Sequence, residues 1–296
     1  MINFNEILEP KKAEILLNAL KCSDNEDFHK LILENLQNII LWLNSKDFEN
    51  YKNNKYPPLF NPETIELEAS EYCANLAWDF NIPLKNIKFI YISPHGVGAA
   101  AFLTLLNEAC KVFSLASWML EEDCKYRYAL NFIASMIKNQ IAINISEINI
   151  KDIDKYLALI DKNTPIIYQA RDPISLIKHS YGRDWSKVER RYERVFDINY
   201  DYRLYIQYLT PNKTYINDDF EKLLDGTFIN HYLLDKINID KIYYLDMSEI
   251  SEKNAYNTFI KLANDFSFTP PPINTKELFK RKEFRGYIRY LFPLTF

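Results

Sequence analysis

The hydrophobic residues in the first quarter of the chain recur at the spacing of helices. Residues 6–45 carry two groups of such residues, which predicts two amphipathic helices. The following stretch, from Asn50 to Pro62, is polar and contains two adjacent prolines, so we expect a linker there. A third helix is predicted over residues 63–80.

Beyond residue 80, short apolar runs alternate with helical patterns. Strands are predicted over residues 87–93, 141–145, 165–170 and 241–246, and helices over residues 99–110, 122–138, 151–160 and 252–266. Asp172 and Pro173 follow the third strand, where the carboxylate can cap a new helix and the proline fits its first turn. This alternation favours an α/β fold with a central parallel sheet flanked by helices. We therefore expect an N-terminal helical segment, residues 1–55, and an α/β domain, residues 56–296.

The composition argues against several classes of protein. A net charge of −4 argues against a general nucleic-acid-binding protein, because such proteins are usually basic. The N-terminus shows no basic stretch before an apolar run, and no apolar run approaches the roughly 18 residues of a membrane span. We expect neither a signal peptide nor an integral membrane segment. The cysteines, Cys22, Cys73, Cys110 and Cys124, lack zinc-ligand spacing and are expected to be reduced thiols in a cytoplasmic protein.

A glycine-containing turn carries the strongest functional signal. The chain has only five glycines, and Gly96 and Gly98 both lie between the strand over 87–93 and the helix over 99–110. Glycine permits close backbone approach, and a helix N-terminus offers unpaired N–H groups and a positive dipole end. The turn from Gly96 through Val97 to Ala99 is therefore a candidate phosphate-binding loop. It lacks the Gly-Lys-Ser/Thr of a Walker A loop, which argues against ATP or GTP hydrolysis, and a turn built only for close packing is the alternative.

His95 lies at the mouth of this turn. Imidazole titrates near neutral pH, so His95 is a candidate general base for a sugar hydroxyl or a donor to a phosphoryl oxygen. A helix-capping or core histidine is the alternative.

Arg171 follows the third predicted strand and offers a planar guanidinium suited to phosphate. Lys178, His179 and Ser180 come two helical turns later, so one or more can return to the same face. Since ligands bind at the carboxyl ends of parallel strands, we expect Arg171 and the glycine turn to face one anion from the same side. A solvent-exposed helix start is the alternative.

Two further features fit an anion site less specifically. Residues 178–194 contain six basic and three acidic residues, and residues 276–289 contain six and two, although ordinary solvated helix faces also have this pattern. His231 is a candidate for acceptor binding or a second base, although a core histidine is the simpler interpretation of its apolar surroundings.

The order of these motifs resembles the sulfotransferase superfamily, whose fold is related to that of P-loop proteins. A strand–turn–helix precedes a strand–Arg171-Asp172-Pro173–helix, and residues 243–249 and 282–286 are similar to the superfamily's late strand and its C-terminal phosphate loop. A closer resemblance, over about residues 56–296, is to bacterial capsular O-methyl phosphoramidate transferases. The motifs that carry it are Tyr56-Pro57-Pro58-Leu59, Leu76-Ala77-Trp78-Asp79, His95-Gly96-Val97-Gly98, Arg171-Asp172-Pro173, Lys178-His179, His231 and Tyr290-Leu291-Phe292-Pro293.

This resemblance implies a transferase whose donor is a cytidine with a 5′-diphosphoramidate and a 3′-phosphate, and whose acceptor is a hydroxyl of a capsular polysaccharide sugar. It implies no metal and no resident cofactor. By analogy, Gly96, Val97, Gly98 and Ala99 would hold the 5′-phosphates. Arg171 and His179 or Ser180 would hold the 3′-phosphate, Lys178 and Arg285 would also bind the donor, and His95 would be the base. A sulfotransferase that uses phosphoadenosine phosphosulfate, and a non-catalytic module whose N-terminal helices recruit partners, remain the alternatives.

Overall fold

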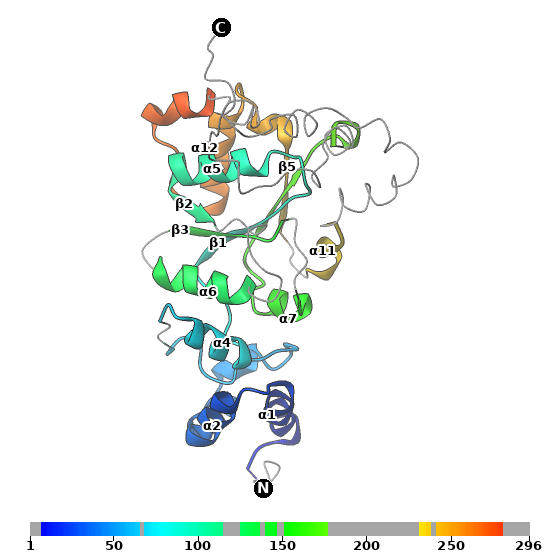
Figure 1. Ribbon diagram of the computed structural model, residues 1–296, viewed down its shortest axis with the longest axis vertical. Helices are drawn as coiled ribbons and strands as arrows, with labels where there is room; N and C mark the ends of the chain where they lie inside the picture. Colours follow the sequence, from blue (N-terminus) through cyan, green and yellow to red (C-terminus); the bar gives the residue numbers. More distant parts are fainter. Residues whose placement is uncertain are drawn as a thin grey trace, which may run out of the picture.

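The protein folds around one parallel sheet. The computed structural model describes residues 7–65, 68–114, 125–136, 140–146, 151–176, 231–237 and 241–280. Within them, five strands lie in the order β2-β3-β1-β4-β5, and every neighbouring pair is parallel (Figure 1). The strands are β1 (Ile87–Ile92), β2 (Val112–Ser114), β3 (Gln140–Asn144), β4 (Ile166–Ala170) and β5 (Ile242–Asp246). The predicted α/β class and all four predicted strands are confirmed.

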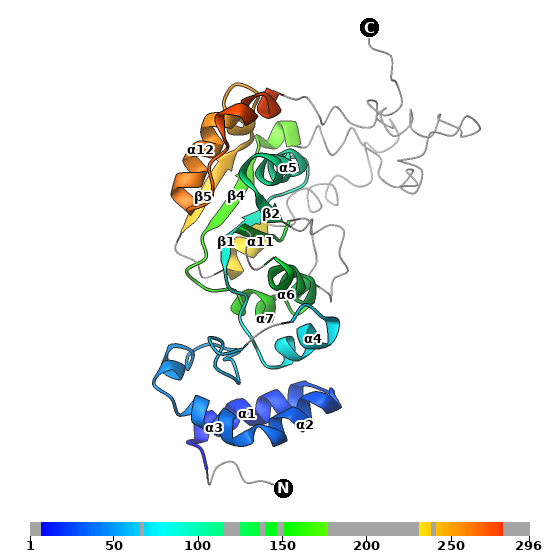
Figure 2. The same ribbon diagram turned by 90° about the vertical axis from the view of Figure 1, so that its left-hand side faces the viewer.

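Helices cover both faces of the sheet, and each face has its own hydrophobic cluster. Phe89 and Tyr91 of β1 point to one face, and the alternating residues Ile90 and Ile92 point to the other. The first face, here the α5 face, is covered by α5 (Ala99–Cys110), α12 (Ala255–Phe266) and the 3₁₀ helix η8 (Ile273–Lys280). The second, here the α6 face, is covered by α4 (Glu71–Asp79), α6 (Lys125–Ser135), α7 (Ile153–Ala158) and α11 (His231–Lys236). Figures 1 and 2 show the sheet between these layers.

The helices that follow neighbouring strands change face at the end of β1. Because all strands are parallel, the loops that follow them lie at one edge. From this edge β1 leads into α5 on one face, whereas its neighbour β3 leads into α7 on the other face. Such a reversal between neighbouring strands is the position at which α/β proteins commonly bind ligands.

The N-terminal region differs from the prediction. It contains three helices rather than two: α1 (Pro10–Cys22), α2 (Glu26–Glu34) and α3 (Leu36–Leu43). The apolar pattern runs on through α2 and α3, but the helix is interrupted at Asn35, whose side-chain Nδ2 donates to the carbonyl of Leu31 at 2.9 Å. Asparagine side chains compete with the helical backbone in this way, which explains the break.

The predicted linker is a packed segment. It starts at the last residue of the 3₁₀ helix η2 (Asp47–Asn50), and Leu59 within it is fully buried. The indole Nε1 of Trp42 donates to the carbonyl of Pro58 at 2.8 Å, and Asn81 Nδ2 donates to the carbonyl of Pro57 at 3.0 Å. The polar composition of this segment predicts a loosely packed linker. In the structure, its prolines and their neighbours instead provide carbonyl acceptors and apolar surface for packing.

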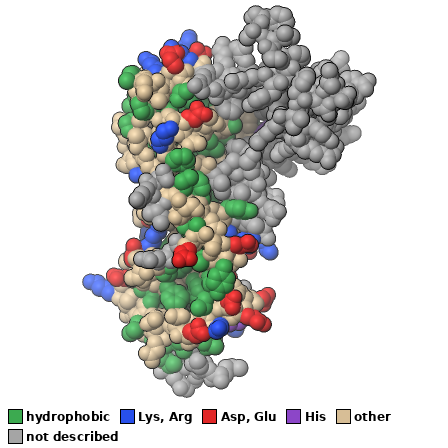
Figure 3. Space-filling view, turned by 60° about the vertical axis from the view of Figure 1, so that its left-hand side comes forward, with side chains coloured by type: hydrophobic (Ala, Val, Ile, Leu, Met, Phe, Trp, Pro, Cys, Tyr) green, Lys and Arg blue, Asp and Glu red, His purple; other side chains and the backbone are tan. Residues whose placement is uncertain are grey.

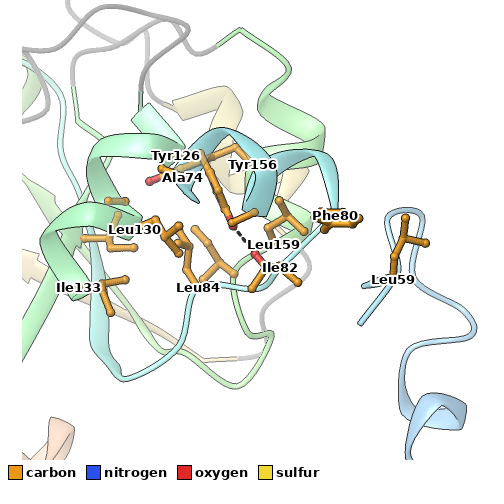
Figure 4. Close-up of a cluster of buried hydrophobic side chains, with 14 of the residues drawn as sticks. Leu59, Ala74, Phe80, Ile82, Leu84, Tyr126, Leu130, Ile133, Tyr156 and Leu159 are labelled. Atoms are coloured by element: carbon orange, nitrogen blue, oxygen red, sulfur yellow. Dashed lines mark hydrogen bonds between the residues drawn. The ribbon is translucent and has the colours of Figure 1, made fainter. Parts of the chain in front are cut away.

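One hydrophobic cluster therefore joins the N-terminal helices to the sheet. It includes side chains from α1, α2 and α3 as well as those on the α6 face. The ring of Phe80 contacts that of Phe28 at a centroid distance of 4.8 Å and that of Phe60 at 4.9 Å. Figure 4 shows the part of this cluster around Tyr126, whose hydroxyl donates to the carbonyl of Ile82. The N-terminal helices thus dock on the α/β core.

Two other features differ from the sequence prediction, the start of helix α4 and the presence of strand β2. Helix α4 begins at Glu71 rather than at residue 63, because the side chain of Ser70 caps the backbone N–H of Cys73 at 3.1 Å. Strand β2 was not predicted. It has only three residues and lies at the edge of the sheet, too short for a hydrophobic pattern to reveal.

The described helices and surface side chains show two further properties. None of the described helices has both the length and the apolar character needed to cross a membrane. On the face shown in Figure 3, acidic and basic side chains of the described part are interspersed.

Candidate functional site

The turn between β1 and α5 adopts the backbone conformation that its glycines allow. Gly96 has a φ of 84° and Gly98 a φ of 91°, in the region that side-chain-bearing residues rarely adopt. Gly98 is the N-cap of α5, and its carbonyl accepts the first helical hydrogen bond, from Phe102 N at 3.1 Å. Glycine has no side chain to cap the helix, so the first-turn N–H groups, those of Ala99 to Ala101, receive no side-chain cap. These groups and the dipole of a 12-residue helix favour an anion.

The neighbours of Gly98 leave little room for a side chain. A Cβ atom at this position would lie 3.3 Å from Ile250 Cδ1, 3.7 Å from Met247 Cε and 3.8 Å from Gln169 Nε2. The first two belong to the 3₁₀ helix η7 (Met247–Ile250), which follows β5. The turn after β1, the end of β4 and the segment after β5 therefore lie next to one another here.

We expect Gly98→Ala to lower the free energy of unfolding by about 2 kcal/mol, because it forces a side chain into a positive-φ conformation and against Ile250. Urea denaturation measures this change. Lys111→Gly is the matched control, since Lys111 ends α5 with a φ of 55° and glycine relieves its strain, so stability should be unchanged or slightly raised. An unchanged stability in Gly98→Ala would contradict the conformation assigned to the turn.

Gln169 of β4 braces the turn from within the sheet. Its side chain is fully buried, accepts a hydrogen bond from the hydroxyl of Tyr91 through Oε1, and donates through Nε2 to the carbonyl of Val97 at 2.8 Å. Tyr91 in turn stacks on Phe102 of α5, with a centroid distance of 4.8 Å and an interplanar angle of 17°. The turn is therefore held by one polar network that crosses from β1 to β4.

Arg171 meets the glycine turn directly. Its Nη1 donates to the carbonyl of Gly96 at 2.9 Å, and the residue is half-buried. The guanidinium carries five N–H donors, so this bond engages a single donor. The two motifs that the sequence separates by 75 positions thus lie at one place, as we predicted from the parallel sheet.

Asp172 caps the helix that starts at Pro173. Its Oδ1 accepts a hydrogen bond from Ser175 N at 2.9 Å, as the Asp-Pro pair predicts. Hydrogen bonds from Ser175 lower the pKa of Asp172, with a smaller contribution from the charge of Arg171. The carboxylate is therefore ionised at neutral pH, and it caps the backbone N–H of Ser175.

The other side of the turn contacts the end of β3. Ser93 Oγ donates to Ser146 Oγ at 3.0 Å, and both residues are fully buried. Asn144, the last residue of β3, accepts a hydrogen bond from Ser146 N at 2.9 Å through Oδ1. Buried polar side chains thus flank the turn on both neighbouring strands.

The acidic residues after β5 have a local structural role. Asp246 and Glu249 form a capping box around η7. Ser248 N donates to Asp246 Oδ1 at 2.8 Å, and Asp246 N donates to Glu249 Oε1 at 2.9 Å.

Cys110, at the far end of α5, is not an activated thiol. Burial raises the pKa of its thiol to about 12, which leaves the thiol protonated and a poor nucleophile. Among the described residues, no group of three or more His, Cys, Asp or Glu side chains is arranged to hold a metal ion.

The structure brings six of the predicted site residues together. They are His95, Gly96, Val97, Gly98, Ala99 and Arg171. The ring of His95 is half-buried and its Nε2 atom is buried, so Nδ1, or Nε2 after rotation of the ring, has to act if His95 is a base. Lys178, His179, Ser180 and Arg285 lie outside the described residues, as does the side chain of His231, which opens α11.

The sequence interpretation missed three polar residues of the site. Gln169, Asn144 and Tyr91 were treated only as parts of strands. Gln169 and Asn144 each interrupt an otherwise apolar run in a buried parallel strand, which is a signal that such a side chain has a specific partner.

Comparison with known proteins gives one match. A family model described as "Protein of unknown function (DUF2972)" matches residues 244–296, which include the end of β5, η7 and α12. Searches of curated proteins and of solved structures found no match.

Proposed function

We propose that this chain is a nucleotide-dependent group transferase, and that it moves an O-methyl phosphoramidate group from a 3′-phosphocytidine donor to a hydroxyl of a capsular sugar in the cytoplasm. The observation that carries the proposal is the contact between Arg171 and Gly96, because it joins a guanidinium to the uncapped N-terminus of α5. Both features favour anions, and together they can bind two phosphate groups of one nucleotide. The cytidine base and the phosphoramidate group come from the family resemblance.

The proposed reaction is a single displacement at phosphorus. The acceptor oxygen bonds to the phosphoramidate phosphorus, and the bond from that phosphorus to the 5′-phosphate oxygen breaks. Cytidine 3′,5′-bisphosphate leaves with the electron pair, and the acceptor proton passes to His95. Such transfers depend on positioning and charge stabilisation, which helix N–H groups and a guanidinium can supply.

Sulfuryl transfer is the second candidate, since the same resemblance includes it. The sulfotransferase loop carries a Lys or Arg and hydroxyl side chains, whereas this turn carries His95 followed, after Gly98, by alanines. This departure favours the phosphoramidate donor.

Thermal shift with nucleotides tests the proposal. We expect cytidine 3′,5′-bisphosphate to raise the melting temperature of the full chain and adenosine 3′,5′-bisphosphate to raise it less, since only ligands bound by the folded state stabilise it. A larger shift with the adenosine compound would favour sulfuryl transfer. No shift with either would contradict a nucleotide-dependent enzyme and favour a binding module.

A further inference from the structure

Asn144 is a buried polar side chain with half of its hydrogen-bonding capacity unused. The residue is 6% exposed, and its Nδ2 is a buried atom that has no hydrogen-bond partner in the part of the chain that the structure describes. The orientation of the amide is fixed by chemistry, because Ser146 N is a donor and requires the amide oxygen opposite it. The unpaired group is therefore an N–H donor. A buried donor without a partner is rare in a folded protein and calls for an explanation.

The fold places this donor beside the glycine turn. In the sheet register Asn144 pairs with Tyr91, which lies on the α5 face, and Ala142, two residues earlier, belongs to the same face. Helix α5 starts at the end of β1 and leads to β2, and β3 lies between these two strands in the sheet. The first turn of α5 thus lies over the edge where β3 ends. The bond between Ser93 and Ser146 holds the two loops together there.

We propose that Asn144 is a ligand-binding residue of this site, and that its Nδ2 donates a hydrogen bond to a phosphate oxygen of the anion held at the N-terminus of α5. The inference rests on the proposed function and names the residue that approaches the same phosphate group from β3. The first-turn N–H groups approach this phosphate from α5, and Arg171, on the β4 side of the turn, is left for the second phosphate of the nucleotide. An amide N–H recognises an acceptor oxygen, so a carboxylate at this position would repel the same ligand.

Inorganic pyrophosphate is a suitable probe, because it presents phosphate oxygens without a base or sugar. Isothermal titration calorimetry on the full chain compares wild type with Asn144→Ala and Asn144→Asp. We expect Asn144→Ala to weaken binding roughly 10-fold, through loss of one charge-assisted hydrogen bond, and Asn144→Asp to weaken it roughly 100-fold, because it also adds a repelling charge.

Asn131→Asp is the matched control. It introduces the same charge at an asparagine that also has a buried side-chain atom but lies on α6. We expect this variant to bind pyrophosphate within about twofold of wild type. Urea denaturation of each variant supplies a readout that separates binding from folding. Asn144→Asp is nearly isosteric and keeps the acceptor for Ser146 N. A purely structural role predicts that the affinity of each variant follows its stability.

The outcomes are distinct. Weakest binding in Asn144→Asp, with this variant at least as stable as Asn144→Ala, supports the inference, and an affinity order that follows the order of stabilities overturns it. Equal affinity in wild type and both Asn144 variants overturns it but leaves the proposed function standing. Absence of pyrophosphate binding in wild type contradicts both.

Discussion

Arg171→Ala is expected to remove the thermal stabilisation by cytidine 3′,5′-bisphosphate and to weaken its binding roughly 100-fold or more. Two effects combine in this variant. The guanidinium is lost as a ligand for phosphate, and each hydrogen bond to a charged group contributes about 1.5–3 kcal/mol. The carbonyl of Gly96 also loses its donor, so the turn that presents the α5 N-terminus is held less firmly. Calorimetric titration with the bisphosphate measures the change.

Two variants control for this result. Arg171→Lys keeps the charge but not the planar fork, and should recover only part of the affinity. Arg127→Ala removes a guanidinium on α6 that donates to Asn75 Oδ1 at 3.0 Å, away from the turn, and should bind the nucleotide as wild type does. If Arg171→Ala bound the bisphosphate normally, Arg171 would be a brace of the turn and not a ligand residue.

Gln169→Leu is expected to lower the free energy of unfolding by about 2–4 kcal/mol. Leucine fits the volume but removes the acceptor of the Tyr91 hydroxyl and the donor to the Val97 carbonyl, both in a fully buried network. Each buried polar group that loses its hydrogen bond costs about 1–3 kcal/mol. The loss should also reduce affinity for the bisphosphate, because the turn is fixed through Val97. Urea denaturation and the thermal shift assay measure the two effects.

Gln140→Leu is the control for this substitution. Gln140 also forms two side-chain hydrogen bonds, both with Thr269, but at an exposed position where water can replace them. We expect a cost below about 1 kcal/mol. Similar costs at the two positions would mean that the Gln169 network does not hold the turn.

The central sheet could be predicted because its strands are continuous apolar runs and because Gly, Asp and Pro mark the turns between them. The run ending at Ile92 and the Asp172-Pro173 pair each specify a boundary through local chemistry. The parallel arrangement then placed Gly96 and Arg171 at one edge, which the hydrogen bond between them confirms.

The missed features depend on contacts between distant segments. Leu59 is buried in a segment that is polar in sequence, and this segment is held by hydrogen bonds from Trp42 of α3 to Pro58 and from Leu59 N to the carbonyl of Phe80. The break at Asn35 interrupts no hydrophobic pattern. Gln169 has its role through Tyr91 on another strand and Val97 in the loop after it, and Asn144 through its place beside β1 in the sheet. Neither spacing nor composition specifies such neighbours.

A crystal structure of the full chain with cytidine 3′,5′-bisphosphate shows where the nucleotide binds. We expect one phosphate at the N-terminus of α5, within hydrogen-bond reach of the N–H groups that follow Gly98, and Arg171 in contact with the same nucleotide. A nucleotide bound at the opposite edge of the sheet, or bound without contact to either the turn or Arg171, would contradict this expectation.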